Sequence, residues 1–364
     1  MRSLVFLLLL PFTAMAQISP TMLTTLSGEV AETSGLLLID GAWWTHNDGG
    51  NAPLLYRIDP ANGGVLRTVE VTNVSNIDWE DIAADDEYVY IGDVGNNSGV
   101  RTDLRILRLP LALLQDENVT GVEADVIEYA YEDQTEFQPA NNANNWDCEA
   151  IMVKDDSLFL FTKNWLDQQT RVYAVPATPG QHQALLRDEY DVEGMITGAA
   201  YHEGTGQVML VGYTNGLFVP FLVRLGGFNG NDLFGGSVVR ESFTLSFVQV
   251  EAVEWHSDGE IFMSNESSPF SQPRLWSLNV PGTTSVGEDE RSGMHVHPNP
   301  AADELWVEGP VEQVVMVDAL GKEVRSAVIG SDGRMDVHHL PPGIYGLRML
   351  TDQGIRAVQV VIDR

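Results

Sequence analysis

Carboxylate and amide side chains recur at corresponding points of several strand-like segments, and one lysine stands among them. The residues that we expect to bind a ligand are Asn47, Asp48, Glu80, Asp93, Asn97, Glu149, Lys163, Glu251 and Glu266. Those that we expect to hold a metal ion are Glu80, Asp93, Glu149 and Glu251. Oxygen ligands of mixed Asp, Glu and Asn type suit Ca²⁺ better than Zn²⁺. Ca²⁺ is therefore the cofactor that the pattern favours.

Lys163 is conspicuous because the chain has only three lysines. We expect its ammonium group either to pair with Glu149 or to contact an anionic group of a ligand, such as a phosphate. The acidic residues also have a purely structural interpretation, since Asp and Asn often end strands by making turns and bonding to nearby backbone amides. The sequence leaves these interpretations open.

The chain offers no recognisable nucleophile. It contains no Gly-x-Ser-x-Gly elbow, no His-Glu-x-x-His motif, no phosphate-binding loop and no dinucleotide fingerprint. These absences argue against a serine hydrolase, a zinc protease and a nucleotide-dependent enzyme. The sequence therefore names no catalytic residue and leaves open whether there is a reaction.

The positions of the polar residues follow from a repeat. Segments that share one plan of strands start near residues 34, 80, 149, 197 and 251. In each, an apolar strand leads through a short turn into a second apolar strand that ends in a polar cluster. Repeats of this kind are typical of the four-stranded blades of a β-propeller. The predicted fold is all-β, with a five-bladed β-propeller over residues 17–280, or six blades if residues 115–146 hold further strands.

The repeat predicts that the polar residues meet. In a blade the innermost strand runs along the central channel and the second strand runs back. The start of the first strand and the end of the second therefore lie on the same face. The acidic and amide residues collect at these two places, so we expect them around one mouth of the channel, where they repel one another unless a cation or a pKa shift offsets the charge. Residues 21–26 are expected to close the ring.

The N-terminus and one internal segment carry signals of export and of domain division. Residues 1–16 are predicted to be a signal peptide, with Arg2, an apolar run and the cleavage site Ala14-Met15-Ala16. Residues 281–292 are rich in Gly, Thr and Glu and are predicted to be a linker. No other stretch is apolar over the length that a bilayer requires. We therefore expect Sec export of a chain without a transmembrane segment.

Residues 293–364 alternate strands with glycine turns, which predicts a small Ig-like β-sandwich. Its motifs include, in order, Val296-His297-Pro298-Asn299-Pro300-Ala301 and Leu340-Pro341-Pro342-Gly343-Ile344-Tyr345. The ordered set resembles the C-terminal sorting domain of the bacterial type IX secretion system. That resemblance implies contact with the type IX machinery, passage across the outer membrane and a secreted or surface location. An ordinary adhesion-type sandwich is the alternative.

A second resemblance lies in the propeller region and rests on Trp79-Glu80-Asp81-Ile82-Ala83, Ile91-Gly92-Asp93-Val94-Gly95-Asn96-Asn97 and Ser264-Asn265-Glu266. These motifs resemble secreted bacterial propellers of the phytase-like, or esterase-like phytase, class. The resemblance implies a calcium-bearing propeller that acts on phosphoesters. The chain departs from calcium phytases in lacking a basic cluster for phosphate.

Three hypotheses of function follow. The first is a secreted propeller that binds an extracellular ligand or partner at an acidic, Ca²⁺-bearing channel face. The second is a calcium-dependent phosphoesterase, that is, a phytase-like hydrolase. The third is a structural surface protein whose propeller is only a scaffold.

Composition limits the partners. The formal net charge is −32, from 20 basic and 52 acidic residues, so the surface repels nucleic acid and anionic membranes and attracts cations. Solubility alone is a second explanation of the charge. The single cysteine, Cys148, excludes an internal disulfide and is predicted to be a buried small hydrophobe. We expect a monomer that binds no nucleic acid.

Overall fold

The computed structural model describes residues 17–280, 295–298, 301–309, 311, 313–317, 323–328, 333–351 and 354–363. The chain divides into two compact units, Met1–Pro281 and Gly282–Arg364. The predicted signal peptide at 1–16 and the predicted linker at 281–292 lie outside the described residues. Within the described ranges, no helix has the length and apolar character needed to cross a membrane.

The first unit consists of antiparallel runs of four strands that follow one another along the chain. In order from the innermost strand outward, the runs are β3 (Thr33–Ile39), β4 (Ala42–Asn47), β5 (Leu54–Ile58) and β6 (Val65–Val71); β7 (Trp79–Ala84), β8 (Tyr88–Asp93), β9 (Arg105–Pro110) and β11 (Asp125–Tyr131); β12 (Cys148–Lys154), β13 (Ser157–Thr162), β14 (Thr170–Pro176) and β15 (Gly180–Tyr190); β16 (Met195–His202), β17 (Gln207–Tyr213), β18 (Pro220–Gly226) and β19 (Ser237–Phe243); and β20 (Val250–Ser257), β21 (Glu260–Asn265), β22 (Arg274–Asn279) and β2 (Thr21–Thr25).

The remaining elements of this unit are short additions to the runs. The strand β1 (Gln17–Ile18) pairs parallel with β19, and β10 (Gly121–Val122) pairs parallel with β6. A parallel pairing of β11 with β15 joins two runs into an eight-stranded sheet. The helix α1 (Leu111–Gln115) and a single 3₁₀ turn at Gly28–Val30 complete the unit.

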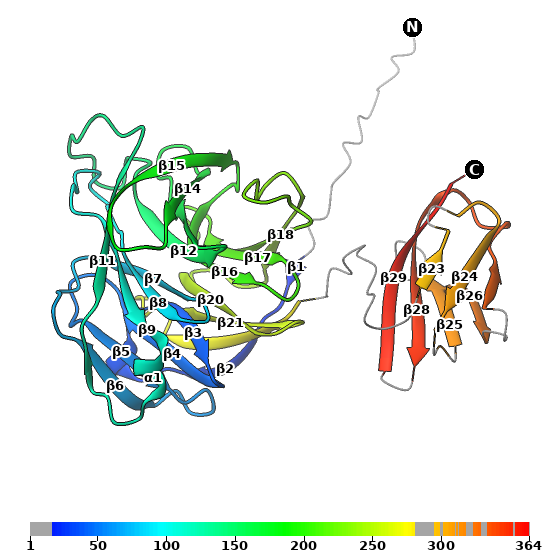
Figure 1. Cartoon of the computed structure of the whole chain (residues 1–364), viewed down its shortest axis with the longest axis horizontal. Coiled ribbons are helices and arrows are strands. Elements are labelled where there is room, and N and C mark those ends of the chain that lie inside the picture. Colours follow the sequence, from blue (N-terminus) through cyan, green and yellow to red (C-terminus); the bar gives the residue numbers. More distant parts are fainter. Residues whose placement is uncertain are drawn as a thin grey trace, which may run out of the picture. The chain divides into compact units, whose positions relative to one another are not determined.

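The innermost strands form a ring, which gives the unit a propeller-like arrangement (Figure 1). Strand β3 packs against β7, β7 against β12, β12 against β16, β16 against β20, and β20 against β3. The predicted closing strand is confirmed, because β2 pairs antiparallel with β22 and so joins the N-terminus to the last run. Trp43 of β4 and Phe262 of β21 stack at 4.5 Å between ring centroids, and so bury aromatic surface where the first and last runs meet.

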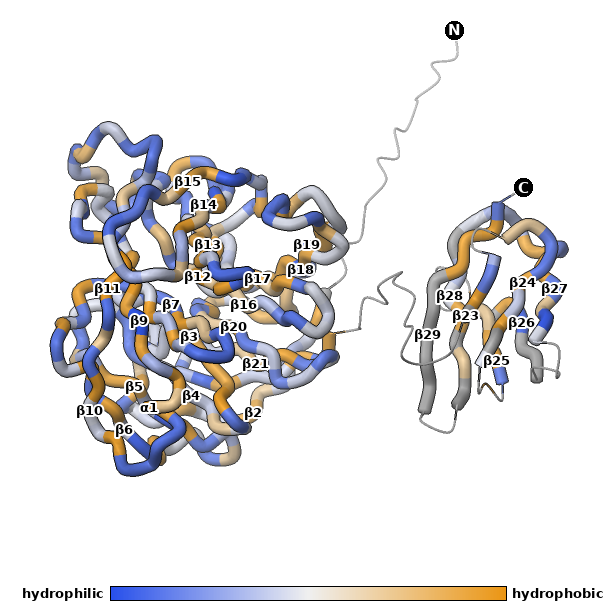
Figure 2. Tube along the Cα trace, in the orientation of Figure 1, coloured by the Kyte–Doolittle hydropathy of each residue, from blue (hydrophilic) through white to orange (hydrophobic). Residues whose placement is uncertain are grey.

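Apolar side chains fill the layers between neighbouring runs. Figure 2 shows the hydrophobic stretches along the strands and hydrophilic residues in many of the connecting loops. Strand β17 is buried over its whole length, because neighbouring runs cover both of its faces. Cys148 is buried and free within this core, as predicted. The core therefore holds the inner strands in fixed positions around the centre.

One buried carboxylate links three inner strands. Asp81 of β7 accepts hydrogen bonds from the backbone N–H groups of Ile82 (2.9 Å), Ile151 of β12 (2.9 Å) and Ala199 of β16 (3.2 Å). Its side chain has no exposed surface, and burial raises its pKa well above the usual value while the three N–H groups act in the opposite direction. Asp81 therefore satisfies backbone donors that the centre of the ring would otherwise leave unpaired.

The second unit is a small sandwich of two sheets. One sheet contains β23 (His295–His297), β24 (Glu304–Glu308) and β27 (Arg334–Asp336). The other has the order β26 (Glu323–Val328), β25 (Gln313–Val317), β28 (Gly343–Thr351) and β29 (Gly354–Ile362). Leu305 and Met335 of the first sheet share one core with Met316, Leu347 and Val360 of the second.

The Asp81 contacts generate a stability prediction. We expect Asp81→Ala to lower the free energy of unfolding by about 3 kcal/mol, because it leaves three buried N–H groups without acceptors. Urea denaturation of the purified protein measures the change. The matched control is Asp86→Ala, which removes an exposed carboxylate in the next turn and should change stability by less than about 0.5 kcal/mol. Equal stability of the two variants would contradict a linking role for Asp81.

Candidate functional site

Three of the predicted glutamates occupy the same structural position in their runs. The register of each inner strand shifts at one residue near its start, and the shifted residue is Glu80 in β7, Glu149 in β12 and Glu251 in β20. The same shift falls on Gly35 in β3 and Thr197 in β16. A β-bulge leaves one residue out of the ladder and redirects its side chain. The bulges therefore turn the glutamates toward the mouth of the ring.

These side chains line a pocket of about 660 Å³. Seven of the nine predicted ligand residues line it, namely Asp48, Glu80, Asn97, Glu149, Lys163, Glu251 and Glu266. Further lining residues include Ser34, Asp78, Asn96, Arg101, Trp165, Tyr213, Phe218 and Gln249. Most of the lining comes from the starts of inner strands and the ends of second strands, the two places at which the repeat puts its polar residues. Longer loops add Ser98, Arg101, Asn141 and Asn142.

The other two predicted residues have internal partners and do not line the pocket. The Asn47 side chain accepts a hydrogen bond from the Glu32 N–H (3.3 Å) and donates one to the Glu29 carbonyl (2.9 Å). Asp93 is buried and forms ion pairs with Arg101 (3.0 Å) and Arg105 (2.8 Å). The oxygens of both side chains are therefore engaged in the fold itself.

One side of the pocket gathers a compact carboxylate cluster. Oxygen atoms of Asp48, Asp78 and Glu80 lie within 4.8 Å of one another. Gly49 and Gly95 make this approach possible: a Cβ at Gly95 would overlap the carboxylates of Glu80 and Asp78, and a Cβ at Gly49 would overlap Asp78. Any residue larger than glycine at these two positions would occupy the space in which the carboxylates converge.

Burial makes the charged form of this cluster unfavourable. It raises the pKa of Asp48 to about 7 and the pKa of Asp78 to about 6, and neighbouring carboxylates add to both shifts. The pKa of Glu80 is raised well above its usual value, first by burial and then by Glu149 and Asp48. The cluster therefore favours either protons or a bound cation at neutral pH.

Lys163 also lines the pocket. Its Nζ atom lies 3.0 Å from the Glu149 carboxylate, which confirms the predicted pair, and it lies over the rings of Trp165 (5.1 Å) and Tyr213 (5.4 Å). Burial alone would lower the pKa of Lys163, but Glu149 and the other nearby acids raise it well above its usual value. Lys163 therefore remains charged and offsets part of the negative charge around it.

Sequence reasoning left several lining residues out of the ligand set. Asp78 and Tyr213 stand at the repeat positions where polar residues collect, so the repeat itself could have included them. Arg101 lies in a loop outside the repeat, and nothing in the sequence marks it. Its guanidinium donates to Asp93 (3.0 Å) and to the Gly95 carbonyl (2.8 Å), so it holds the loop that carries Gly95.

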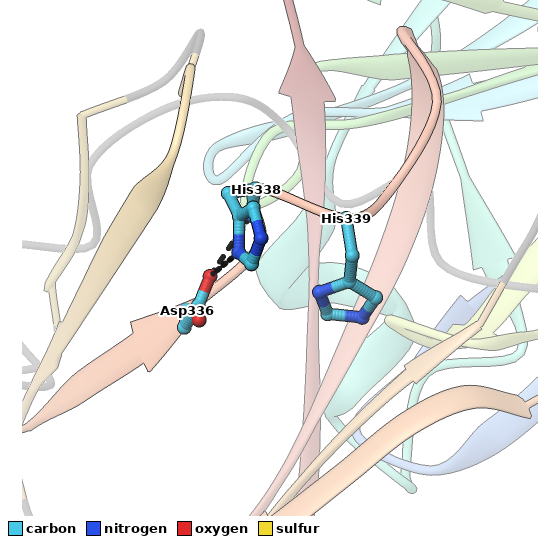
Figure 3. A group of neighbouring side chains, drawn as sticks. All are labelled: Asp336, His338 and His339. Carbon is cyan, nitrogen blue, oxygen red and sulfur yellow. Dashed lines mark hydrogen bonds and ion pairs between the residues drawn. The ribbon is translucent and has the colours of Figure 1, made fainter.

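A separate cluster lies in the second unit (Figure 3). Potential ligand atoms of Asp336, His338 and His339 lie within 4.8 Å of one another, and all three side chains are exposed. His338 Nδ1 lies 2.7 Å from an Asp336 oxygen that also accepts the His338 backbone N–H. This carboxylate therefore orients one imidazole within an open turn of the sandwich.

The second unit also carries the match to a known family. Residues 295–363 match the family described as the secretion system C-terminal sorting domain. The chain thus carries a type IX sorting tail. The predicted location is confirmed: the protein is exported to the cell surface or secreted. No curated protein matches the chain.

Several solved structures match this chain at low sequence identity and low TM-score. PorZ, a surface component of the type IX secretion system of Porphyromonas gingivalis, is 11% identical, with 91% of this chain and 45% of that chain covered and a TM-score of 0.36. The extracellular domain of a putative hybrid two-component system from B. thetaiotaomicron is 12% identical, with coverages of 96% and 60% and a TM-score of 0.34. The WD40 β-propeller domain of Doa1 is 11% identical, with coverages of 96% and 97% and a TM-score of 0.31.

The chain thus spans about half the length of the first of these structures. At such identities and TM-scores the likenesses carry no inference about function. The resemblance to phytase-like propellers is not tested by these matches and stays a prediction.

The raised pKa values predict how stability depends on pH. Asp48 has a folded pKa of about 7 against the usual 3.8, so its protonated form is favoured in the fold. Between about pH 4 and pH 7 Asp48 is ionised in the unfolded chain but protonated in the fold, so the free energy of unfolding falls as pH rises. Above pH 7 Asp48 is ionised in both states, and this contribution levels off. With chelator present, Asp48→Asn should flatten this fall and raise the melting temperature at pH 7 by about 2–4 °C.

Thermal melts from pH 4 to pH 8 measure this effect. Asp86→Asn, which removes an exposed carboxylate, is the control and should leave the wild-type profile unchanged. A profile of Asp48→Asn parallel to that of the wild type would show that Asp48 is not the desolvated group described here.

Proposed function

We propose that this protein is a type IX secretion cargo whose five-bladed β-propeller binds an extracellular ligand through a Ca²⁺ ion at the pocket, and whose tail is an Ig-like sandwich. The five runs of four strands, each starting at an inner strand of one ring, support the blade count. The two sheets around one core support the Ig-like tail. The observation that carries the ligand site is the convergence of Asp48, Asp78 and Glu80 between two glycines.

The cluster has the chemistry that Ca²⁺ requires. Ca²⁺ binds oxygen at about 2.3–2.6 Å, so two ligands of one ion stand no more than about 5 Å apart. The oxygens of Asp48, Asp78 and Glu80 meet this condition at 4.8 Å or less. Ca²⁺ takes about six to eight oxygens, and three carboxylates that bind through one oxygen each leave several positions open. The three carboxylates line a pocket, where water or an oxygen-rich ligand could complete the coordination.

Unpaired buried acids give independent support. Glu80 is 4% exposed and Glu251 is 7% exposed, and both line the pocket. Neither carboxylate accepts a hydrogen bond or forms an ion pair with any described residue. Buried carboxylates in folded proteins are normally paired. Their partner is therefore expected from outside the chain, either as a cation or as a group of the ligand.

Ca²⁺ titration of the purified protein tests the proposal. Calorimetry should detect binding, and excess Ca²⁺ should raise the melting temperature. Gly95→Ala should weaken Ca²⁺ binding by about tenfold or more, because its Cβ would fill the space between Asp78 and Glu80. The matched control is Gly28→Ala, whose Cβ would meet no atom within 4 Å.

Two results would contradict the site. If the wild-type protein showed no heat and no shift of melting temperature in excess Ca²⁺, the pocket would hold no calcium. If Gly95→Ala bound Ca²⁺ like the wild type, the ion would bind elsewhere on the acidic surface.

A calcium-dependent phosphoesterase is the second candidate, and one observation favours it. Arg101 and Lys163 both line the pocket that contains the carboxylate cluster, so two cations stand where the sequence pointed to one. Both are engaged, however, Arg101 with Asp93 and Lys163 with Glu149. We therefore expect no turnover of phytate or of a simple phosphomonoester with Ca²⁺. Hydrolysis that disappears in the double variant Glu80→Gln, Lys163→Met would instead establish the phosphoesterase.

A further inference from the structure

Apolar side chains project from the loops around one sector of the pocket. Leu217, Phe247 and Phe270 are 59%, 42% and 74% exposed. They lie in the loop after β17, the loop before β20 and the loop after β21, which also contribute Phe218, Gln249 and Glu266 to the pocket lining. The rings of Phe247 and Phe270 are 5.5 Å apart between centroids. We call these three residues the apolar rim.

The backbone holds the rim in a defined shape. The Phe247 N–H donates to the Leu217 carbonyl (3.0 Å), and the Val248 N–H donates to the Phe218 carbonyl (3.2 Å), so the two loops are bonded to each other. Phe247 has φ +60° and Phe218 has φ +45°. Bulky residues rarely adopt this conformation, and it persists where the surrounding structure imposes it, commonly at binding sites. The rim is thus a built surface with its aromatic side chains left in solvent.

The loops and strands that carry the rim also bring acidic groups to the pocket. Glu251 follows Phe247 by four residues and lines the pocket without a hydrogen-bond or ion-pair partner among the described residues. Glu266 precedes Phe270 by four residues and accepts a hydrogen bond from Gln249 (2.7 Å). The pocket lining contains six carboxylates and two cations, a formal excess of four negative charges. A divalent ion at the Asp48 cluster would offset half of that excess, so a second cationic group is still favoured near Glu251.

We propose that the apolar rim and Glu251 form a docking surface for a polypeptide partner that inserts an arginine or lysine side chain into the pocket and packs neighbouring apolar side chains on Phe247 and Phe270. The estimate of the negative charge that remains in the pocket rests on the calcium site proposed above. The geometry of the apolar rim and of Glu251 does not depend on that site. The excess negative charge disfavours an anionic lipid surface. Leucine and phenylalanine side chains offer no hydrogen bonds to sugar hydroxyls, whereas peptide anchors of arginine and aromatic residues commonly dominate such interfaces.

Selection from a random linear-peptide library tests the proposal with the purified full chain as bait. Wild-type protein should enrich peptides in which arginine or lysine neighbours an aromatic or aliphatic residue. Calorimetry with one enriched peptide should then show binding weakened by about tenfold or more in Phe270→Ser and in Glu251→Gln. The matched control is Leu66→Ser, which removes a side chain of equal exposure (59%) to Leu217 from the outer strand β6, and which should bind like the wild type.

The outcomes separate this proposal from the calcium site. Each peptide titration is run with Ca²⁺ and with chelator, and the melting temperature of each variant shows that it is folded. Peptide binding that survives in chelator, in a protein that binds no Ca²⁺, would support the docking surface and overturn only the metal. The docking surface would be overturned if no peptide were enriched, or if the enriched peptides lacked basic residues. It would also be overturned if Phe270→Ser bound the peptide as tightly as the wild type, or if the protein bound polysaccharides in place of peptides.

Discussion

The burial of several carboxylates at the narrow centre of a ring is the constraint on which the rest of the structure depends. Inner strands of the runs approach one another closely, and each has a bulge at the same point. In three of them the bulged residue is a glutamate, and these bulges direct Glu80, Glu149 and Glu251 into one mouth. Like charges in a low-dielectric space repel strongly, and desolvation adds to the penalty. A polar opening of this kind persists because the apolar layers between runs supply the stability that the acids remove. The pocket is thus a destabilised region carried by a well-packed scaffold.

The acids at this centre differ in how their charge is satisfied. Asp81 receives three backbone N–H groups, and Asp93 receives two arginines. Glu149 has Lys163. Glu80 and Glu251 have no such partner among the described residues, although they are also buried. Carboxylates with internal partners hold strands and loops together. Carboxylates that face a pocket without such partners are available to a cation or a ligand group from outside the chain. This difference in partners, and not the density of acids, is what distinguishes a binding site from a structural core.

Much of this arrangement could be predicted from the repeat, and the exceptions have physical causes. Recurrent strands and the closing segment at 21–26 follow from alternation and spacing, and the tail follows from an ordered set of motifs. The repeat also places most of the predicted ligand residues at one mouth, because the starts and ends of strands share a face. It could not separate Asn47 and Asp93 from the pocket, since a side chain's direction depends on partners such as Glu29 and Arg101 that lie in irregular loops. The exposed rim has no repeat signal at all.

In the proposed calcium site, protons and the cation would compete for the same oxygens, which would link the binding state of the pocket to the surroundings of an exported protein. With pKa values of about 7 for Asp48 and about 6 for Asp78, a substantial fraction of the cluster carries protons just below neutral pH, and a Ca²⁺ ion would have to displace them. Apparent calcium affinity should therefore rise with pH until both acids are ionised, whereas the stability of the metal-free fold falls over the same interval. Calcium modules that work outside cells bind with dissociation constants of about 10⁻⁴–10⁻³ M. A cluster of three carboxylates that protons also bind, with open coordination positions, suits that range of affinity. Such a cluster would release its ion at mildly acidic pH without any rearrangement of the strands that hold it.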